Sequence, residues 1–140
     1  MSAGAIKTQL MASLNAMGTL KGAFAYETGN PNGKYPFATL TLKSGDGVYA
    51  DIAHNLRKHS YWIRVYQEQS KEGQGVAQAD TIVIAVLDEL IAHLDQNTTL
   101  SGVCKFARPA SYNASYINRE LDTRILEVQI DAMDLVASNT

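Results

Sequence analysis

A strand pattern and the longest helical pattern of the chain follow one another in the stretch from Ser60 to Asn97, SYWIRVYQEQSKEGQGVAQADTIVIAVLDELIAHLDQN. From Val76 to Leu94, apolar residues recur at spacings of three and four, which predicts an amphipathic helix with one broad apolar stripe. The stripe consists of Ile82, Val83, Val86, Leu87, Leu90, Ile91 and Leu94. Burial of one Val, Leu or Ile side chain is worth about 1.5–3 kcal/mol, so we expect this helix to supply much of the core.

The helix is preceded by a predicted strand, Tyr61 to Gln67, in which aromatic and β-branched residues dominate. Its residues alternate between two faces. The apolar face consists of Tyr61, Ile63 and Val65, and the amphipathic face consists of Trp62, Arg64 and Tyr66. Between strand and helix, Ser70 to Gly75 is polar and contains two glycines, which predicts a turn. The stretch therefore forms a unit of strand, loop and helix.

Upstream of this unit, the same kinds of pattern predict a further helix and further strands. Apolar spacing predicts an amphipathic helix from Ala5 to Met17, and a short strand is expected at Ala23 to Tyr26. The segment from Phe37 to Leu42 alternates like a half-buried strand, which Ser44 to Gly47 is expected to break. The next residues, Val48 to Asn55, fit either a short strand or an irregular segment.

Downstream of the helix, two more strands are predicted. Leu100 to Phe106 alternates like a strand, whereas Arg108 to Arg119 is polar and is expected to form a long loop or hairpin tip. A last strand spans Ile125 to Asp131. Its apolar pattern continues through Met133 and Leu135 only if a bulge shifts the register at that point.

This order of elements favours an α+β fold, with a mostly antiparallel sheet and two helices packed on one face. A chain of 140 residues is long enough for one domain with its own core, so residues 1–140 are expected to form a single domain. The opposite face of the sheet is expected to be polar, as in a surface exposed to solvent or in a polar protein contact. Its residues are predicted to be Thr39, Thr41, Arg64, Tyr66, Glu127 and Gln129.

The composition narrows the class of protein. The formal net charge is −2, which argues against a dedicated nucleic-acid binder, because such proteins cluster Lys and Arg. A single cysteine, Cys104, rules out an intrachain disulfide. The sequence contains neither a signal-peptide pattern nor an apolar run of about 18 residues, so we expect a soluble globular domain without a membrane partner.

The residues capable of chemistry do not form a recognisable catalytic or metal-binding pattern. His54 and His59 lack a further metal ligand at a known spacing, and His93 falls on the polar side of the helix. Cys104 is expected to be a buried residue rather than a nucleophile. An enzyme or small-molecule binding domain that uses Asp51 and His54 is kept as an alternative. No catalytic residue, cofactor or metal site is predicted.

Basic and aromatic residues interleave around the predicted central strand, and they include Arg57, Arg64 and Tyr66. Platforms for single-stranded nucleic acids have this composition. Acidic residues lie close by in the sequence, however, and protein interfaces are enriched in the same aromatic and arginine residues. These three residues are therefore predicted to contribute to a protein interface.

Four segments, together with the N-terminal helix and the late pair of strands, form an arrangement that covers most of the chain. They are Tyr35 to Ala38, His54 to Arg57, Tyr61 to Tyr66 and Thr81 to Leu94. This arrangement resembles the tail terminator proteins, also called tail-completion or head-tail joining proteins, of long-tailed bacteriophages.

The resemblance implies a structural virion protein without enzymatic activity. Such a protein forms a hexameric ring at the head-proximal end of the tail tube, ends tube polymerisation and provides the head-tail joining surface. The implied partners are further copies of the chain, the tail tube protein and a head-completion or connector protein. DNA would pass through the ring without specific binding, which suits a mildly acidic protein.

The implied location is the tail or neck of the virion, after assembly in the host cytoplasm. Another neck or head-completion protein of the same virion is the nearest alternative. The alternative from a different class is the small-molecule binding domain or enzyme that uses His54 and Asp51.

Overall fold

The structure is a computed structural model that describes residues 3–26, 36–49, 54–68, 74–100, 102, 104, 106–116 and 123–137. Its elements follow in the order α1 (Ala3–Asn15), β1 (Gly22–Phe24), β2 (Phe37–Tyr49), β3 (His54–Glu68), α2 (Gln74–Gln96), β4 (Phe106–Tyr116) and β5 (Thr123–Ala137). The five strands form one sheet in the order β1-β2-β3-β5-β4. Only the β1 and β2 pair is parallel, so the protein has the predicted α+β fold with a mostly antiparallel sheet.

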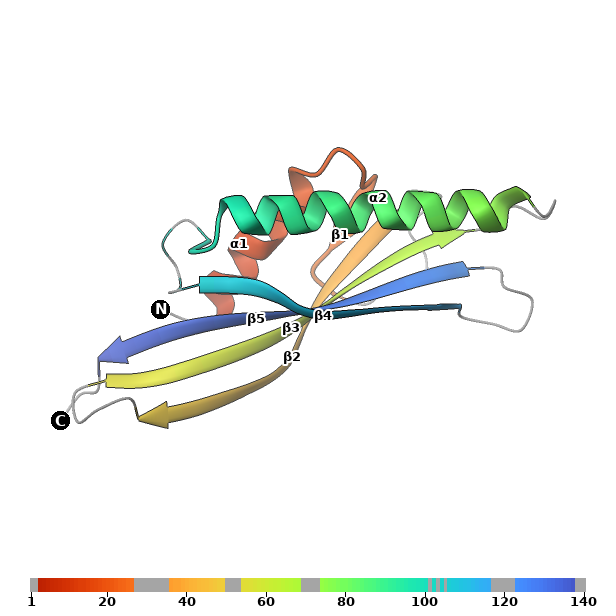
Figure 1. Cartoon of the computed structure of the whole chain (residues 1–140). Coiled ribbons are helices and arrows are strands. Elements are labelled where there is room, and N and C mark those ends of the chain that lie inside the picture. The colour runs from red at the N-terminus through yellow and green to blue at the C-terminus, as the bar shows by residue number, and fades with distance from the viewer. Residues whose placement is uncertain are drawn as a thin grey trace.

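Both helices lie on the same face of the sheet (Figure 1). The long helix α2 contacts β3, β4 and β5, and α1 contacts β1, β2 and α2. The connection through α2 carries the chain from β3 past β5 to β4, which becomes an edge strand. At one end of the sheet, β2, β3 and β5 extend beyond both helices (Figure 1). We call this part, formed by the last residues of β2 and β5 and the first residues of β3, the projecting end.

The core forms between the apolar stripe of α2 and the alternate residues of the sheet that face it. From α2 it takes Val83, Val86, Leu87, Leu90 and Leu94, and from the three central strands Ala38, Leu40, Tyr61, Ile63, Val65, Leu126, Val128 and Ile130. From α1 it takes Ile6, Leu10 and Leu14. The predicted apolar face of Tyr61 to Gln67 is therefore confirmed. Five of the seven predicted stripe residues are buried, whereas Ile82 and Ile91 are only partly buried.

Polar contacts fix the helices to this core. The buried Tyr61 hydroxyl donates a hydrogen bond to the Ala3 carbonyl oxygen at 2.7 Å, and burial raises the pKa of Tyr61 to about 12. The Thr19 N–H and hydroxyl both donate to Glu89 Oε1, and this backbone hydrogen bond lowers the pKa of Glu89. These contacts join the start of α1 to β3 and the turn after α1 to α2.

The long hairpin of β2 and β3 corrects one prediction. Ser44 to Gly47 does not end the strand, because β2 remains paired with β3 as far as Tyr49. The register shifts between Leu42 and Ser44, which is a local irregularity rather than a break. Glycines and polar residues are tolerated here, because the projecting end contributes little to the core. Residues 50–53 lie outside the described residues.

The segment after α2 corrects two more predictions. The predicted strand from Leu100 to Phe106 is wrong at its start, since Leu100 and Gly102 have φ values of 49° and 89°, and strand β4 begins only at Phe106. Leu100 is nevertheless buried, which explains the alternating pattern. The predicted loop from Arg108 to Arg119 is instead strand β4 as far as Tyr116, and residues 117–119 lie outside the described residues. Polar residues are tolerated on β4, because an edge strand is exposed on one side.

The bulge that would carry the apolar pattern of the last strand through Met133 and Leu135 is absent from the pairing of β5 with β3. β5 pairs with β3 without a register shift from Thr123 to Ala137, and the inward face continues at the buried Ala132. The irregularity lies in the neighbouring β4, between Pro109 and Ser111. A proline at this position fits an edge strand, because it lacks a backbone donor.

Leu90→Ala is expected to lower the free energy of unfolding by about 2–5 kcal/mol, because Leu90 is fully buried at the centre of the α2 stripe and leaves a cavity. Chemical denaturation measures the effect. The control is Ile84→Ala, which removes an apolar side chain that is 50% exposed on the same helix and should cost about 0.5 kcal/mol or less. Equal effects of the two substitutions would show that the stripe does not form the core.

Candidate protein-interaction face

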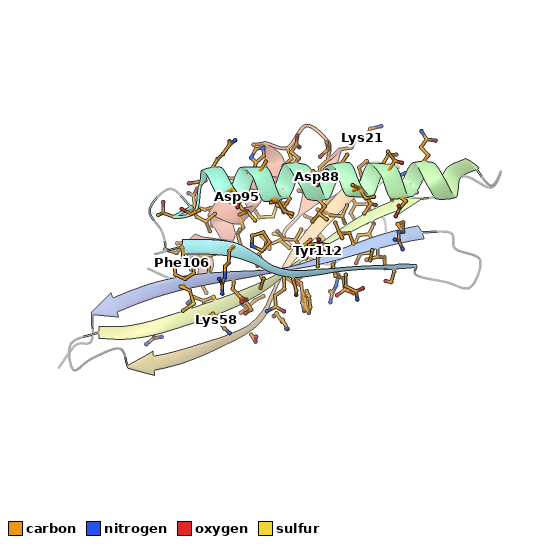
Figure 2. The ribbon with its side chains drawn as sticks, viewed as in Figure 1. Lys21, Lys58, Asp88, Asp95, Phe106 and Tyr112 are labelled. Atoms are coloured by element: carbon orange, nitrogen blue, oxygen red, sulfur yellow. The ribbon has the colours of Figure 1, made fainter. Side chains whose placement is uncertain are left out.

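The sheet face opposite the helices is not covered by any helix or strand that the structure describes (Figure 1). We call it the open face. The strand registers and the alternation away from the core assign to it Thr39, Thr41, Lys43, Lys58, Ser60, Trp62, Arg64, Tyr66, Arg108, Glu127, Gln129 and Asp131. Lys58 can be seen on the side of the sheet away from α2 (Figure 2). The registers also place Met133 and the 41% exposed Phe106 in the row of Lys58, so the open face is largely polar with an apolar patch next to Arg108.

Aromatic rings gather at the end of the open face near β1. Phe37 stacks on Tyr66 with 4.8 Å between the ring centroids and 15° between the ring planes. Phe24 of β1 meets the edge of Phe37 at 5.8 Å. This cluster attaches the three-residue strand β1 to the sheet and partly buries Tyr66, one of the predicted interface residues.

Trp62 lies between two cations at the centre of the open face. Lys43 Nζ is 4.7 Å from its ring centroid, and Arg64 Cζ is 5.6 Å from it. Arg64 also approaches Glu127, with 3.6 Å between Nε and Oε2. Thr39, which was predicted to be an outward polar residue, faces this side but is fully buried beneath its neighbours. The exposed chemistry of the open face therefore comes from the longer side chains.

A chain of hydrogen bonds crosses the open face from β2 to β3 and β5. Lys43 Nζ donates to Gln129 Oε1 at 2.8 Å, and Gln129 Nε2 donates to Asp131 Oδ1 at 3.1 Å. Ser60 Oγ donates to the same Asp131 oxygen at 2.7 Å. These bonds hold the side chains in one arrangement before any partner binds, which reduces the entropy lost on binding.

The pKa of Asp131 reflects this network. Partial burial raises it, but the hydrogen bonds from Gln129 and Ser60, together with the charges of Lys58 and Arg108, outweigh burial and hold the pKa below its ordinary value. Asp131 is therefore ionised at neutral pH and offers a fixed negative charge beside two cations.

Helix α2 is acidic, whereas the open face is weakly basic. Helix α2 has four carboxylates, Asp80, Asp88, Glu89 and Asp95, and no Lys or Arg. The open face has the cations Lys43, Lys58, Arg64 and Arg108 against the carboxylates Glu127 and Asp131. Such a mixed, weakly basic surface suits an interface with a protein better than a phosphate-binding surface, which requires clustered cations.

The structure brings together two of the three predicted interface residues. Arg64 and Tyr66 lie on the open face, two residues apart on β3, whereas Arg57 is exposed on the other side of the same strand, at the projecting end. Sequence reasoning missed Lys43, because the irregularity after Leu42 determines which way its side chain points. It also missed the role of Asp131, because the bond to Ser60 depends on strand pairing.

The residues of the enzyme alternative fall largely outside the part of the chain that the structure describes. Asp51 lies outside the described residues, and the structure describes the backbone of His54 in β3 but not its side chain. Cys104 is buried in the turn before β4, with Sγ 3.5 Å from the Thr99 carbonyl oxygen. Among the described side chains, no group of three or more His, Cys, Asp or Glu could hold a metal ion. None of the described helices is long and apolar enough to span a membrane.

Asp131→Ala is expected to lower the free energy of unfolding by about 1–3 kcal/mol at pH 7, because it leaves Ser60 and Gln129 without their acceptor. The pKa of Asp131 is lower in the folded than in the unfolded state, so its contribution is present above pH about 3.9 and is lost as the pH falls through the folded-state pKa. Denaturation of both proteins between pH 7 and pH 2 measures this. A difference that grows in acid would contradict the assignment.

The fold was compared with known proteins. The sequence matches no family model and no curated protein sequence. A solved structure described as the virion of a native gene transfer agent particle contains a similar chain, with a TM-score of 0.59 and 18% identity over 97% of both chains.

A second similar chain belongs to an extracellular contractile injection system, described as the PVC sheath/tube terminator in its extended state. Its TM-score is 0.57 at 12% identity, and the match covers all of the present chain and 58% of the other. The chain therefore has a fold that occurs in a gene transfer agent virion and in a sheath/tube terminator, in agreement with the resemblance drawn from the sequence.

Proposed function

We propose that this protein ends the polymerisation of a phage-type tail tube and provides the surface to which the head is joined. One observation carries the proposal: the whole chain matches the fold of a sheath/tube terminator, although only 12% of the aligned residues are identical. The similar chain in a gene transfer agent virion supports a place in the tail or neck of a virion. Assembly would take place in the host cytoplasm, before the head is joined.

The surface of the domain is suited to contacts with unlike partners. Its open face is weakly basic and held by internal hydrogen bonds, whereas helix α2 on the other side is acidic. A terminator must bind the last tube layer on one side and prevent a further layer on the other, so its two sides have to differ. The open face with Arg64 and Tyr66, and Arg57 at the projecting end, would contribute contacts to the tube and the head-side proteins.

The proposed assembly is a closed ring of copies. Identical subunits joined through unlike surfaces either close into a ring or extend without limit, and a terminator must close. The hexamer implied by the sequence resemblance would have a mass of about 91 kDa, six times 15.2 kDa. DNA would pass through its opening without specific binding. This arrangement needs no catalytic centre or cofactor.

The test is to polymerise tube protein with and without this chain and to measure tube lengths by electron microscopy. The chain should shorten the tubes and give a narrow length distribution. Unchanged lengths and unchanged tube ends would contradict the terminator function and would favour another neck or head-completion protein.

Arg64→Gln should weaken this effect, because it removes a charge from the open face. A loss of about 1.4 kcal/mol in binding would require about tenfold more protein for the same tube length. Asp88→Asn is the matched control, since it removes one charge from the exposed surface of α2. If Asp88→Asn weakens capping as much as Arg64→Gln does, the open face is not the contact surface.

A further inference from the structure

The sheet has two unpaired edges in the part of the chain that the structure describes. On one side, β1 pairs only with Phe37 to Thr39, so β2 lacks an outer partner strand from Leu40 to Tyr49. On the other side, β4 pairs only with β5. The turn before β4 caps its first residues, where the Ala107 N–H donates to the Thr98 carbonyl oxygen, but no described residue pairs with its outer side from Arg108 onward.

These two edges are compatible with each other in length and direction. Each free segment has nine or ten residues, and at about 3.3 Å per residue each is about 30 Å long. The pairs β2 with β3, β3 with β5, and β5 with β4 are all antiparallel, so β2 and β4 run in opposite directions. The β4 edge of one copy therefore meets the β2 edge of an equally oriented neighbour as an antiparallel pair.

Exposed apolar side chains mark both edges. Leu42 on β2 is 56% exposed, and Tyr112 on β4 is 60% exposed. Both lie on the helix-covered side of the sheet, because their partners in the adjacent strands, Tyr61 and Val128, belong to the core. Across the sheet, the pairing registers align Leu42 with Pro109. Tyr112 is aligned with Leu40, the preceding residue of β2 on the same side of the sheet. A small shift between copies would bring Leu42 and Tyr112 together as a cross-strand pair.

The edges also carry features that limit unspecific pairing. Pro109 and the irregularity after it interrupt the β4 edge, and the irregularity after Leu42 interrupts the β2 edge. Such features are typical of edges that must not aggregate. They leave nearly the full length of each strand available, however, and they restrict pairing to registers in which the two irregularities fit.

We propose that the outer edge of β4 in one copy pairs antiparallel with the outer edge of β2 in the next copy, so that the sheets join head to tail around a closed ring. This inference rests on the ring of the proposed function and identifies the surfaces that build it. Edge pairing leaves the open face free for the tube and head-side partners. It also satisfies backbone groups that are otherwise left to solvent.

The experiment uses the full-length protein and measures its mass in solution by sedimentation velocity and native mass spectrometry over a range of concentrations. Leu42→Lys places a charge on the β2 edge, and Tyr112→Lys places one on the β4 edge. Ala114→Pro is a second β4 variant, because the pairing pattern directs the Ala114 N–H outward, away from β5. The matched control is Ile84→Lys, which changes an exposed apolar residue of α2. Circular dichroism verifies that every variant is folded.

Wild type and Ile84→Lys should form a closed oligomer of one size, and the three edge variants should be monomers of 15.2 kDa. A mixture of Leu42→Lys and Tyr112→Lys should form a dimer that does not grow, because one intact edge of each kind remains. Homodimers of a single edge variant would overturn the head-to-tail arrangement. A wild-type monomer at every concentration, or edge variants that oligomerise like wild type, would overturn edge pairing.

The tube-length assay separates this inference from the proposed function. If the edge variants shorten tubes as well as the wild-type protein does, edge pairing is overturned and the terminator function remains in place. Rings that depend on both edges but do not affect tube length would overturn the terminator function and support edge pairing.

Discussion

The packing of α2 on one face of the sheet is the constraint on which the rest of the structure depends. The helix buries its apolar stripe against β3, β4 and β5, and its crossover from β3 to β4 makes β4 an edge strand. The bond between Arg124 of β5 and Asp80 of α2, at 3.1 Å, adds a polar connection to this contact. In the described part of the chain all helical cover lies on one side, so no described element covers the open face or the outer edges of β2 beyond Thr39 and of β4.

In the proposed ring, the edges and the open face would serve different purposes. The edges offer unsatisfied backbone groups and exposed apolar side chains, which suit contacts between identical copies. The open face offers fixed charges and hydrogen bonds, whose arrangement is already set by the contacts of Lys43 and Asp131. A small domain can in this way bind its own copies and unlike partners at the same time.

The sequence predicted well the features that depend on local periodicity. The spacing in α2 and the alternation around Ile63 each repeat several times, and each repetition indicates the same buried face. The predictions failed where tertiary contacts override the local pattern. β4 is polar because it lies at an edge, and the turn at Leu100 contains a buried residue without being a strand.

The candidate site was predictable only in part, for a related reason. Alternation along β3 placed Arg64 and Tyr66 on one face. The position of Lys43 depends on the irregularity after Leu42, which the residue types around it do not indicate. The bond between Ser60 and Asp131 joins residues 71 positions apart, so it becomes apparent only when the strand order is known. The free edges likewise follow from the order of the strands rather than from any single segment.

Cryo-electron microscopy of tubes assembled in the presence of this protein would show where the protein binds. We expect one additional closed ring at one end of each tube, with the present fold in its density and no tube layer beyond it. Tube ends without such a ring, or copies of this protein repeated along the tube, would rule out a tube terminator.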